Sequence, residues 1–126
     1  MGMTAHVVYT AWDVERPGSQ SPIVIHDIIR ERIGFDGFLM SDDIGMEALS
    51  GDHGQRAASC VAAGCDVALH CDGKMENMIL VAKAVPALSP EGEARLARAM
   101  ALTFTPQDGM DFAAAVEKRD ALLALV

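Results

Sequence analysis

Two adjacent carboxylates, Asp42 and Asp43, stand at the end of an apolar run that is entered through Gly37. Apolar runs of this length are typical of strands buried on both faces of a sheet. A carboxylate at the C-terminal end of a parallel strand lies where α/β folds place their chemistry. Such a carboxylate can serve as a nucleophile, because the strand holds it rigidly.

The two carboxylates are not expected to share one task. Adjacent side chains of a strand point to opposite faces of the sheet, so both cannot face one substrate. We expect Asp43 to take a structural role, either capping a turn or pairing with a cation. From periodicity alone, capping of the following helix is also the more common use of Asp42. A chemical role for Asp42 therefore depends on further motifs.

Further polar residues lie in or after the other apolar segments. His6 is inside the run 4–9, where a hydrogen-bonded core histidine is the usual case. His70, Cys71 and Asp72 follow the last apolar run, and all three are metal-ligand types. Consecutive residues of an extended strand cannot easily converge on one ion. We therefore expect no metal and no cofactor, while Asp72 can line a site at the strand end.

The remaining candidates have ordinary structural explanations. His26 and His53 are typical of a surface helix and a surface loop. Several methionines are expected to fill gaps in the core, as methionine commonly does: Met40, Met46, Met75 and Met78.

The predicted elements alternate along the chain. Strands are predicted over residues 4–9, 37–41 and 66–70. Helices are predicted from a cap at Ser21, over 55–63 and 75–85, from a cap at Ser89, and after Gly109. This alternation is the pattern of parallel α/β units, followed by C-terminal helices.

Helical spacing also predicts which side chains face the core. In the helix after Ser21 they are Ile25, Ile28, Ile29 and Ile33, with Gly34 as the stop. In the helix over 75–85 they are Met75, Met78, Ile79 and Ala82.

Composition excludes several classes of protein. The net charge of −8 argues against a nucleic-acid partner, because the phosphate backbone requires a basic surface. No apolar run of about 18 residues is present, so no membrane span is expected. The three cysteines form no CxxC pair, and an odd number of isolated thiols favours a reducing compartment, the cytoplasm. The length is that of one domain, covering 1–126.

Several separated motifs together resemble one family. One local pattern is similar to the nucleophile segment of glycoside hydrolase family 3, in its bacterial β-N-acetylhexosaminidase branch: Gly34-Phe35-Asp36-Gly37-Phe38-Leu39-Met40-Ser41-Asp42-Asp43-Ile44-Gly45-Met46. Three further segments occur in the same order as in that family: residues 3–13 before the nucleophile strand, Ser21-Pro22 at the intervening helix, and Ala62-Ala63-Gly64-Cys65-Asp66 before the final strand. The resemblance extends from about the N-terminus to the nineties.

The resemblance implies both a fold and an activity. The fold would be the last part, about three strands, of a TIM-type (β/α)₈ barrel, so that 1–126 is a partial catalytic domain. The activity would be removal of terminal β-linked N-acetylglucosamine with retention, in bacteria from peptidoglycan fragments in the cytoplasm. Asp42 takes the position of the nucleophile, and His6, Met46 and Asp72 are substrate-binding candidates. The family's Lys-His-Phe-Pro-Gly-His-Gly segment, which begins the acid/base loop, is absent from these 126 residues, so catalysis is expected to be incomplete.

Two other functions are alternatives to the glycosidase. One is a non-catalytic barrel remnant that self-associates, because three parallel strands leave two open sheet edges. A homo-oligomer is expected on the same grounds. The other is a phosphoacceptor receiver domain, in which an apolar strand also ends in Asp. Receivers carry an acidic pair after their first strand, whereas Tyr9-Thr10 stands at that place here, which disfavours this class.

Overall fold

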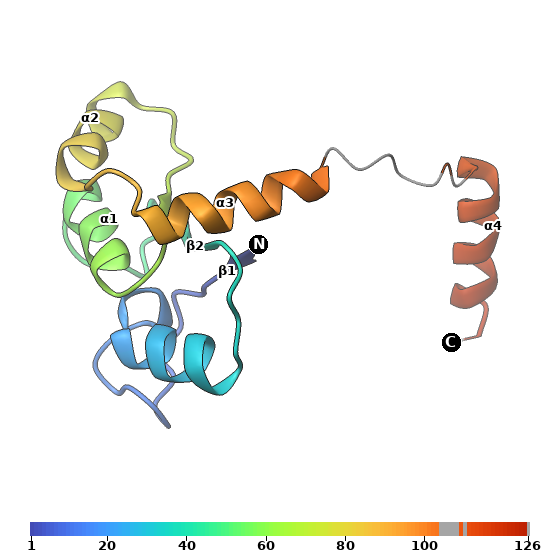
Figure 1. Cartoon of the computed structure of the whole chain (residues 1–126), viewed down its shortest axis with the longest axis horizontal. Coiled ribbons are helices and arrows are strands. Elements are labelled where there is room, and N and C mark those ends of the chain that lie inside the picture. Colours follow the sequence, from blue (N-terminus) through green and yellow to red (C-terminus); the bar gives the residue numbers. More distant parts are fainter. Residues whose placement is uncertain (104–108, 110, 126) are drawn as a thin grey trace.

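The computed structural model describes residues 1–103, 109 and 111–125. Three short strands alternate with helices along the chain (Figure 1). The elements are β1 (Gly2–Met3), the 3₁₀-helix η1 (Gly18–Gln20), the π-helix η2 (Ile23–Arg32), β2 (Leu39–Asp43), α1 (His53–Ala62), β3 (Val67–Leu69), α2 (Met75–Ala84), α3 (Pro90–Thr103) and α4 (Phe112–Leu123). The predicted alternation of strands and helices is confirmed.

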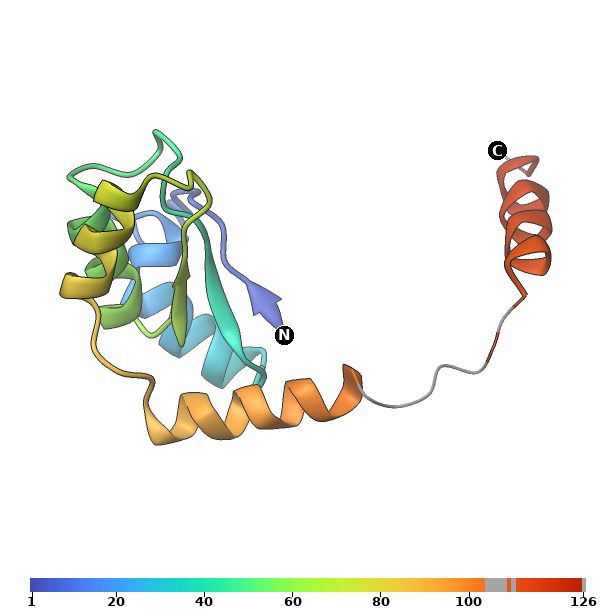
Figure 2. The same cartoon turned by 90° about the horizontal axis from the view of Figure 1, so that it is seen from above.

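The strands form one parallel sheet in the order β1–β2–β3. Met40 pairs with Val67 and Asp43 with Leu69, so the register shifts by one residue between these pairs. Figure 2 shows η2, α1 and α2 on one side of the sheet, and none of these helices covers the other side. The core fills the space between sheet and helices, with Ile25, Leu39, Ile44, Leu49, Ala57, Cys60, Ala63 and Cys65.

The first strand is shorter and earlier than predicted. Its last ladder bond runs from Thr4 N to Met40 O, at 2.9 Å. Beyond that point the backbone is hydrogen-bonded to the start of η1: Gly18 N donates to Val7 O and Ser19 N to Ala5 O. Because these groups are satisfied within the loop, the apolar run 4–9 does not extend the sheet.

The helix after Ser21 begins as expected but winds differently. Ser21 Oγ accepts from Val24 N at 3.2 Å and so caps the helix. The winding is that of a π-helix, with Ile33 N donating to Ile28 O. This wider winding departs from α-helical spacing, and Ile33 is 68% exposed although Ile25 is buried. The prediction for Ile33 was wrong, whereas Gly34 adopts the expected positive φ, 73°.

Helix α2 packs through other residues than those predicted. Met75, Met78 and Ile79 are exposed, and Ala82 is exposed as well. Val81 and Val85 pack against the core instead. The contact with α1 is close at Gly54, where an added Cβ would lie 2.9 Å from the carbonyl oxygen of Leu80. The helix is therefore oriented by this close approach rather than by its methionines.

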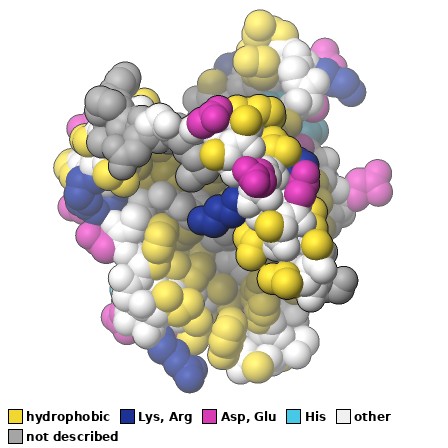
Figure 3. All heavy atoms as spheres, turned by 90° about the vertical axis from the view of Figure 1, so that its right-hand side faces the viewer, with side chains coloured by type: hydrophobic (Ala, Val, Ile, Leu, Met, Phe, Trp, Pro, Cys, Tyr) yellow, Lys and Arg dark blue, Asp and Glu magenta, His cyan; other side chains and the backbone are white. Residues whose placement is uncertain are grey.

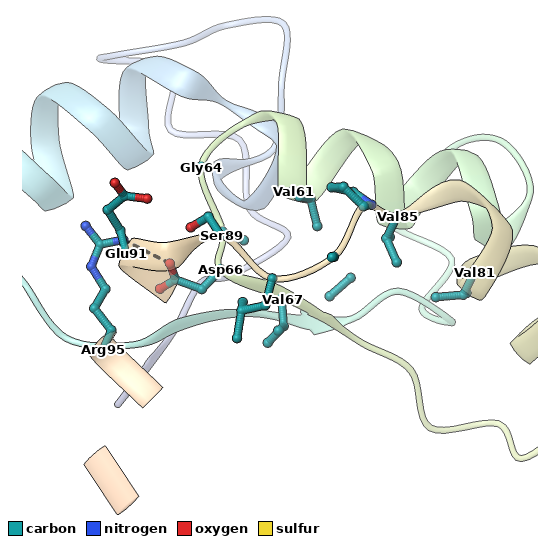
Figure 4. A pocket seen from close by; sticks show the side chains of 14 residues that line it. Val61, Gly64, Asp66, Val67, Val81, Val85, Ser89, Glu91 and Arg95 are labelled. Carbon is teal, nitrogen blue, oxygen red and sulfur yellow. Dashed lines mark hydrogen bonds and ion pairs between the residues drawn. The ribbon is translucent and has the colours of Figure 1, made fainter. Parts of the chain in front are cut away.

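A buried carboxylate ties the start of the sheet to two helices. Asp66 Oδ2 accepts from Leu39 N at 2.8 Å and lies 3.0 Å from Arg30 Nη2 of η2. Asp66 Oδ1 lies 2.9 Å from Arg95 Nη1 of α3. The contact between Asp66 and Arg95 lies at one end of a pocket of about 440 Å³ beside β3 (Figure 4).

No helix of the described residues is both long and apolar enough to cross a membrane.

Candidate active site

Strand β2 separates the two neighbouring carboxylates, as expected. Leu39 and Ser41 are buried on the side of the helices. Met40 and Asp42 alternate with them, so they face the side of the sheet that η2, α1 and α2 leave open. Asp42 is only half-buried. Its carboxylate is therefore accessible at the C-terminal end of the central strand.

The backbone around Asp42 is fixed by the preceding serine. Ser41 Oγ donates to Asp42 O at 2.7 Å and accepts from Leu69 N of β3 at 3.0 Å. Asp42 Oδ1 accepts from Asp43 N at 2.8 Å. Among the residues that the structure describes, no cation lies within ion-pair distance of Asp42. The same residues donate no hydrogen bond to the second oxygen of this carboxylate.

Asp43 performs the structural task expected of it. Its Oδ1 accepts from Gly45 N at 2.9 Å, which closes the turn after β2. The same oxygen accepts from Cys71 N at 3.2 Å and so links this turn to the end of β3. The prediction that Asp43 caps a turn is confirmed.

His6 supports the end of β2 from the neighbouring segment. Its Nε2 lies 3.0 Å from Asp43 O, and its Nδ1 is hydrogen-bonded to Ser19 Oγ. A carbonyl oxygen only accepts, so these partners assign the proton to Nε2 and make Nδ1 the acceptor. Both ring nitrogens therefore have protein partners, and His6 positions the strand end that carries Asp42.

Met46 lies in the turn after β2 and is 45% exposed. Its backbone N donates to Asp43 O. The turn is also held by Arg56 of α1, whose Nη1 donates to Ile44 O at 3.0 Å and to Met46 O at 3.2 Å. Sequence reasoning missed Arg56. The available signal was a single cation in the helix that follows the carboxylate pair.

Asp13 organises the loop before η1. Its carboxylate is buried and accepts from the Ser21 hydroxyl at 2.7 Å and from the backbone N–H groups of Glu15 and Arg16. The hydrogen bond from Ser21, followed by that from Glu15, lowers the pKa of Asp13. Since Ser21 also caps η2, Asp13 couples the loop to that helix.

Asp72 lies with two histidines after β3. Its carboxylate accepts from Lys74 N at 2.8 Å and from Asn77 Nδ2 at 2.5 Å, and these bonds lower the pKa of Asp72. His70 alternates with Ala68, which packs against the core, so the His70 side chain faces the helices. The ring of His53, at the start of α1, meets that of His70 edge-on. Asp42 and His70 thus lie on opposite faces of the sheet.

Comparison with known proteins identifies the family. Residues 1–102 match the model of the glycosyl hydrolase family 3 N-terminal domain. A β-hexosaminidase from Chromobacterium violaceum is 41% identical over 98 residues, which is 76% of this chain and 27% of that protein. One from Aromatoleum aromaticum is 38% identical over 113 residues, 88% of this chain and 31% of that protein.

A solved structure of similar fold agrees with these relatives. NagZ from Neisseria gonorrhoeae, in complex with N-trifluoroacetyl-D-glucosamine, superposes with a TM-score of 0.62 at 28% identity, covering 80% of this chain and 32% of that one. The chain thus spans less than a third of the length of the two curated relatives. Because residues 1–102, most of this chain, match the family model, the chain belongs to glycosyl hydrolase family 3.

Proposed function

We propose that this chain supplies the nucleophile-bearing part of a β-N-acetylhexosaminidase barrel, with Asp42 as the nucleophile. The observation that carries the proposal is the placement of Asp42. It is accessible at the C-terminal end of the central parallel strand, and Ser41 anchors its backbone to β3. The substrate would be a terminal β-linked N-acetylglucosamine, in keeping with the hexosaminidase names of the relatives.

The chemistry follows that of a retaining glycosidase. Asp42 attacks the anomeric carbon and forms a glycosyl–enzyme ester, which water then hydrolyses. A second group must protonate the leaving oxygen. The acid/base segment of the family does not occur in these 126 residues, and His6 and His70 do not fill the gap. His6 has both nitrogens bonded, and His70 faces the other side of the sheet.

The open edge of β3 supports completion by further strands. A closed barrel pairs its last strand with its first. Here β3 pairs only with β2 among the described strands, and the pocket of about 440 Å³ runs along its other side. The apolar lining of this pocket includes Val67 of β3, Val81 of α2 and Val85 at the C-terminal end of α2 (Figure 4). A completing first strand would lie there.

The test is covalent labelling in a completed barrel. The chain is fused behind the part of the Chromobacterium violaceum relative that precedes the matched segment, and the fusion is incubated with a 2-fluoro glycosyl inhibitor. Peptide mass spectrometry should find the sugar on Asp42. Asp43→Asn is the matched control and should still be labelled at Asp42. Labelling of Asp43, or full labelling of Asp42→Asn, would refute the assignment.

The 126 residues alone should turn over an activated aryl β-N-acetylglucosaminide far more slowly than the fusion does. General acid catalysis contributes about 10²–10⁴ in rate, and its loss adds to the loss of substrate orientation. Equal rates for the chain and the fusion would contradict the claim that catalysis in these residues is incomplete.

A self-associating, non-catalytic role is the second candidate. Hydrophobic side chains gather in a hollow on the face seen from the open side of the sheet (Figure 3). Exposed apolar surface of this kind favours association, and a homodimer is its simplest closed form. Light scattering that finds a monomer at all concentrations would exclude this candidate.

All three cysteines are free, which supports the cytoplasmic location that peptidoglycan recycling implies.

A further inference from the structure

His53, His70 and Asp72 converge on one point at the C-terminal end of β3. His70 Nε2 lies 2.8 Å from Asp72 Oδ1, and His53 Nε2 lies 3.7 Å from Asp72 Oδ2. One ligand atom from each of the three residues lies within 4.8 Å of the others. The two imidazole rings are 5.0 Å apart between centroids. Three potential metal ligands thus lie close enough together to share one ion.

Of these three residues, His70 is the one whose buried ring lacks hydrogen-bond partners in the described part of the chain. Its side chain is 9% exposed. Neither of its ring nitrogens has a hydrogen-bond partner among the described residues, although the carboxylate of Asp72 lies close by. A buried imidazole without a partner costs free energy, because the groups that would hydrogen-bond it in water are absent. A metal ion bound at Nε2 would satisfy this nitrogen.

The other two ligands are oriented and reachable. Asp72 is held by Lys74 N and Asn77 Nδ2, the kind of outer contact that fixes a ligating carboxylate. The side chains of His53 and Asp72 are each 23% exposed, so an ion can enter from solvent. Tetrahedral zinc with bonds of about 2.0–2.2 Å separates its ligand atoms by about 3.3 Å. The distances from His70 Nε2 to Asp72 Oδ1, 2.8 Å, and from His53 Nε2 to Asp72 Oδ2, 3.7 Å, lie on either side of that value.

We infer that His53, His70 and Asp72 form a binding site for a divalent transition-metal ion of the Zn²⁺ class. Two neutral imidazoles and one carboxylate form a ligand set that Zn²⁺ accepts, with a fourth position left for water. The bound ion would tie the start of α1 to the loop between β3 and α2. The sequence led us to expect no metal, because consecutive residues of one strand cannot easily converge on an ion. In the proposed site one ligand, His53, comes from a different element, α1.

Isothermal titration of the full chain with ZnCl₂ tests the site. We expect one ion per chain and a rise in the thermal midpoint that a chelator reverses. Substitution of Co²⁺ should give the visible band of a tetrahedral N/O site without a thiolate charge-transfer band. His53→Gln and Asp72→Asn alter partly exposed side chains and should each weaken zinc binding by about tenfold or more. These two variants avoid any folding defect of a change at buried His70.

Two control variants distinguish this site from zinc binding at other exposed ligand residues. His26→Gln removes an exposed histidine that lies beside Asp27 and Glu31, and it should leave zinc binding unchanged. Cys71→Ser removes the exposed thiol between the proposed ligands, and it should also leave binding unchanged. Loss of binding in either control would overturn the assignment. So would wild-type zinc affinity in both His53→Gln and Asp72→Asn, or no saturable binding by the unaltered chain.

Discussion

Replacing Asp66 with Asn tests what holds strand β2 in place. The carboxylate has a side chain only 4% exposed and meets Arg30, Arg95 and the backbone N–H of Leu39. An Asn oxygen in the Oδ2 position keeps the bond to Leu39. Its NH₂ group would then face Arg95 Nη1, which is also a donor, so that contact is lost together with the charge.

The expected loss of stability follows from these contacts. Removing one partner of a buried ion pair costs about 3–5 kcal/mol. Arg30 and Arg95 remain 14% and 22% exposed, so water partly compensates them, and about 2–4 kcal/mol is the better expectation. At roughly 4 °C per kcal/mol, the thermal midpoint should fall by about 8–16 °C. Urea unfolding followed by circular dichroism gives the free energy directly.

Asp36→Asn is the matched control for this prediction. Asp36 meets the same Arg95, at 3.4 Å, and Arg98, at 2.8 Å, but its side chain is 76% exposed. Exposed pairs contribute about 0.2–1 kcal/mol, so this variant should remain close to the unaltered chain. Equal destabilisation by the two substitutions would refute the reasoning, because burial would then not decide the contribution of the carboxylate.

Three further predictions concern chemistry and pH. In the completed barrel, Asp42→Asn should lower turnover of an aryl β-N-acetylglucosaminide by several orders of magnitude, measured by steady-state kinetics; near-normal turnover would exclude a covalent role. The folded-state pKa of Asp13 lies below the ordinary value of 3.8, so its stabilisation is fully present above about pH 4 and is lost as the pH falls through the lowered pKa. The stability difference between the unaltered chain and Asp13→Asn should therefore shrink from about pH 7 to about pH 3 in denaturant titrations, and a constant difference would contradict this linkage. Burial raises the pKa of Cys60, and it raises that of Cys65 to about 12, so a thiol reagent at mildly alkaline pH should modify Cys71 quickly in the folded chain and all three thiols only after unfolding; fast reaction of Cys65 in the folded chain would count against its burial.

Local signals in the sequence determined the order of the elements and the family. Gly34 and Gly64 end helices with positive φ, and Ser21 and Ser89 cap helices, because these are short-range properties of the residues themselves. The opposite orientations of Asp42 and Asp43 were also predictable, since a strand alternates its side chains whatever surrounds it.

Only the tertiary structure decided which distant groups meet. His53 reaches His70 and Asp72, and Arg56 holds the turn after β2, because α1 packs beside β3. Contacts between distant residues also overrode local patterns. The run 4–9 is hydrogen-bonded to Gly18 and Ser19 instead of extending the sheet, and α2 turns Val81 rather than Met78 to the core. Strand and helix periodicity fixes the faces that an element offers, but packing between elements selects the partner that each face receives.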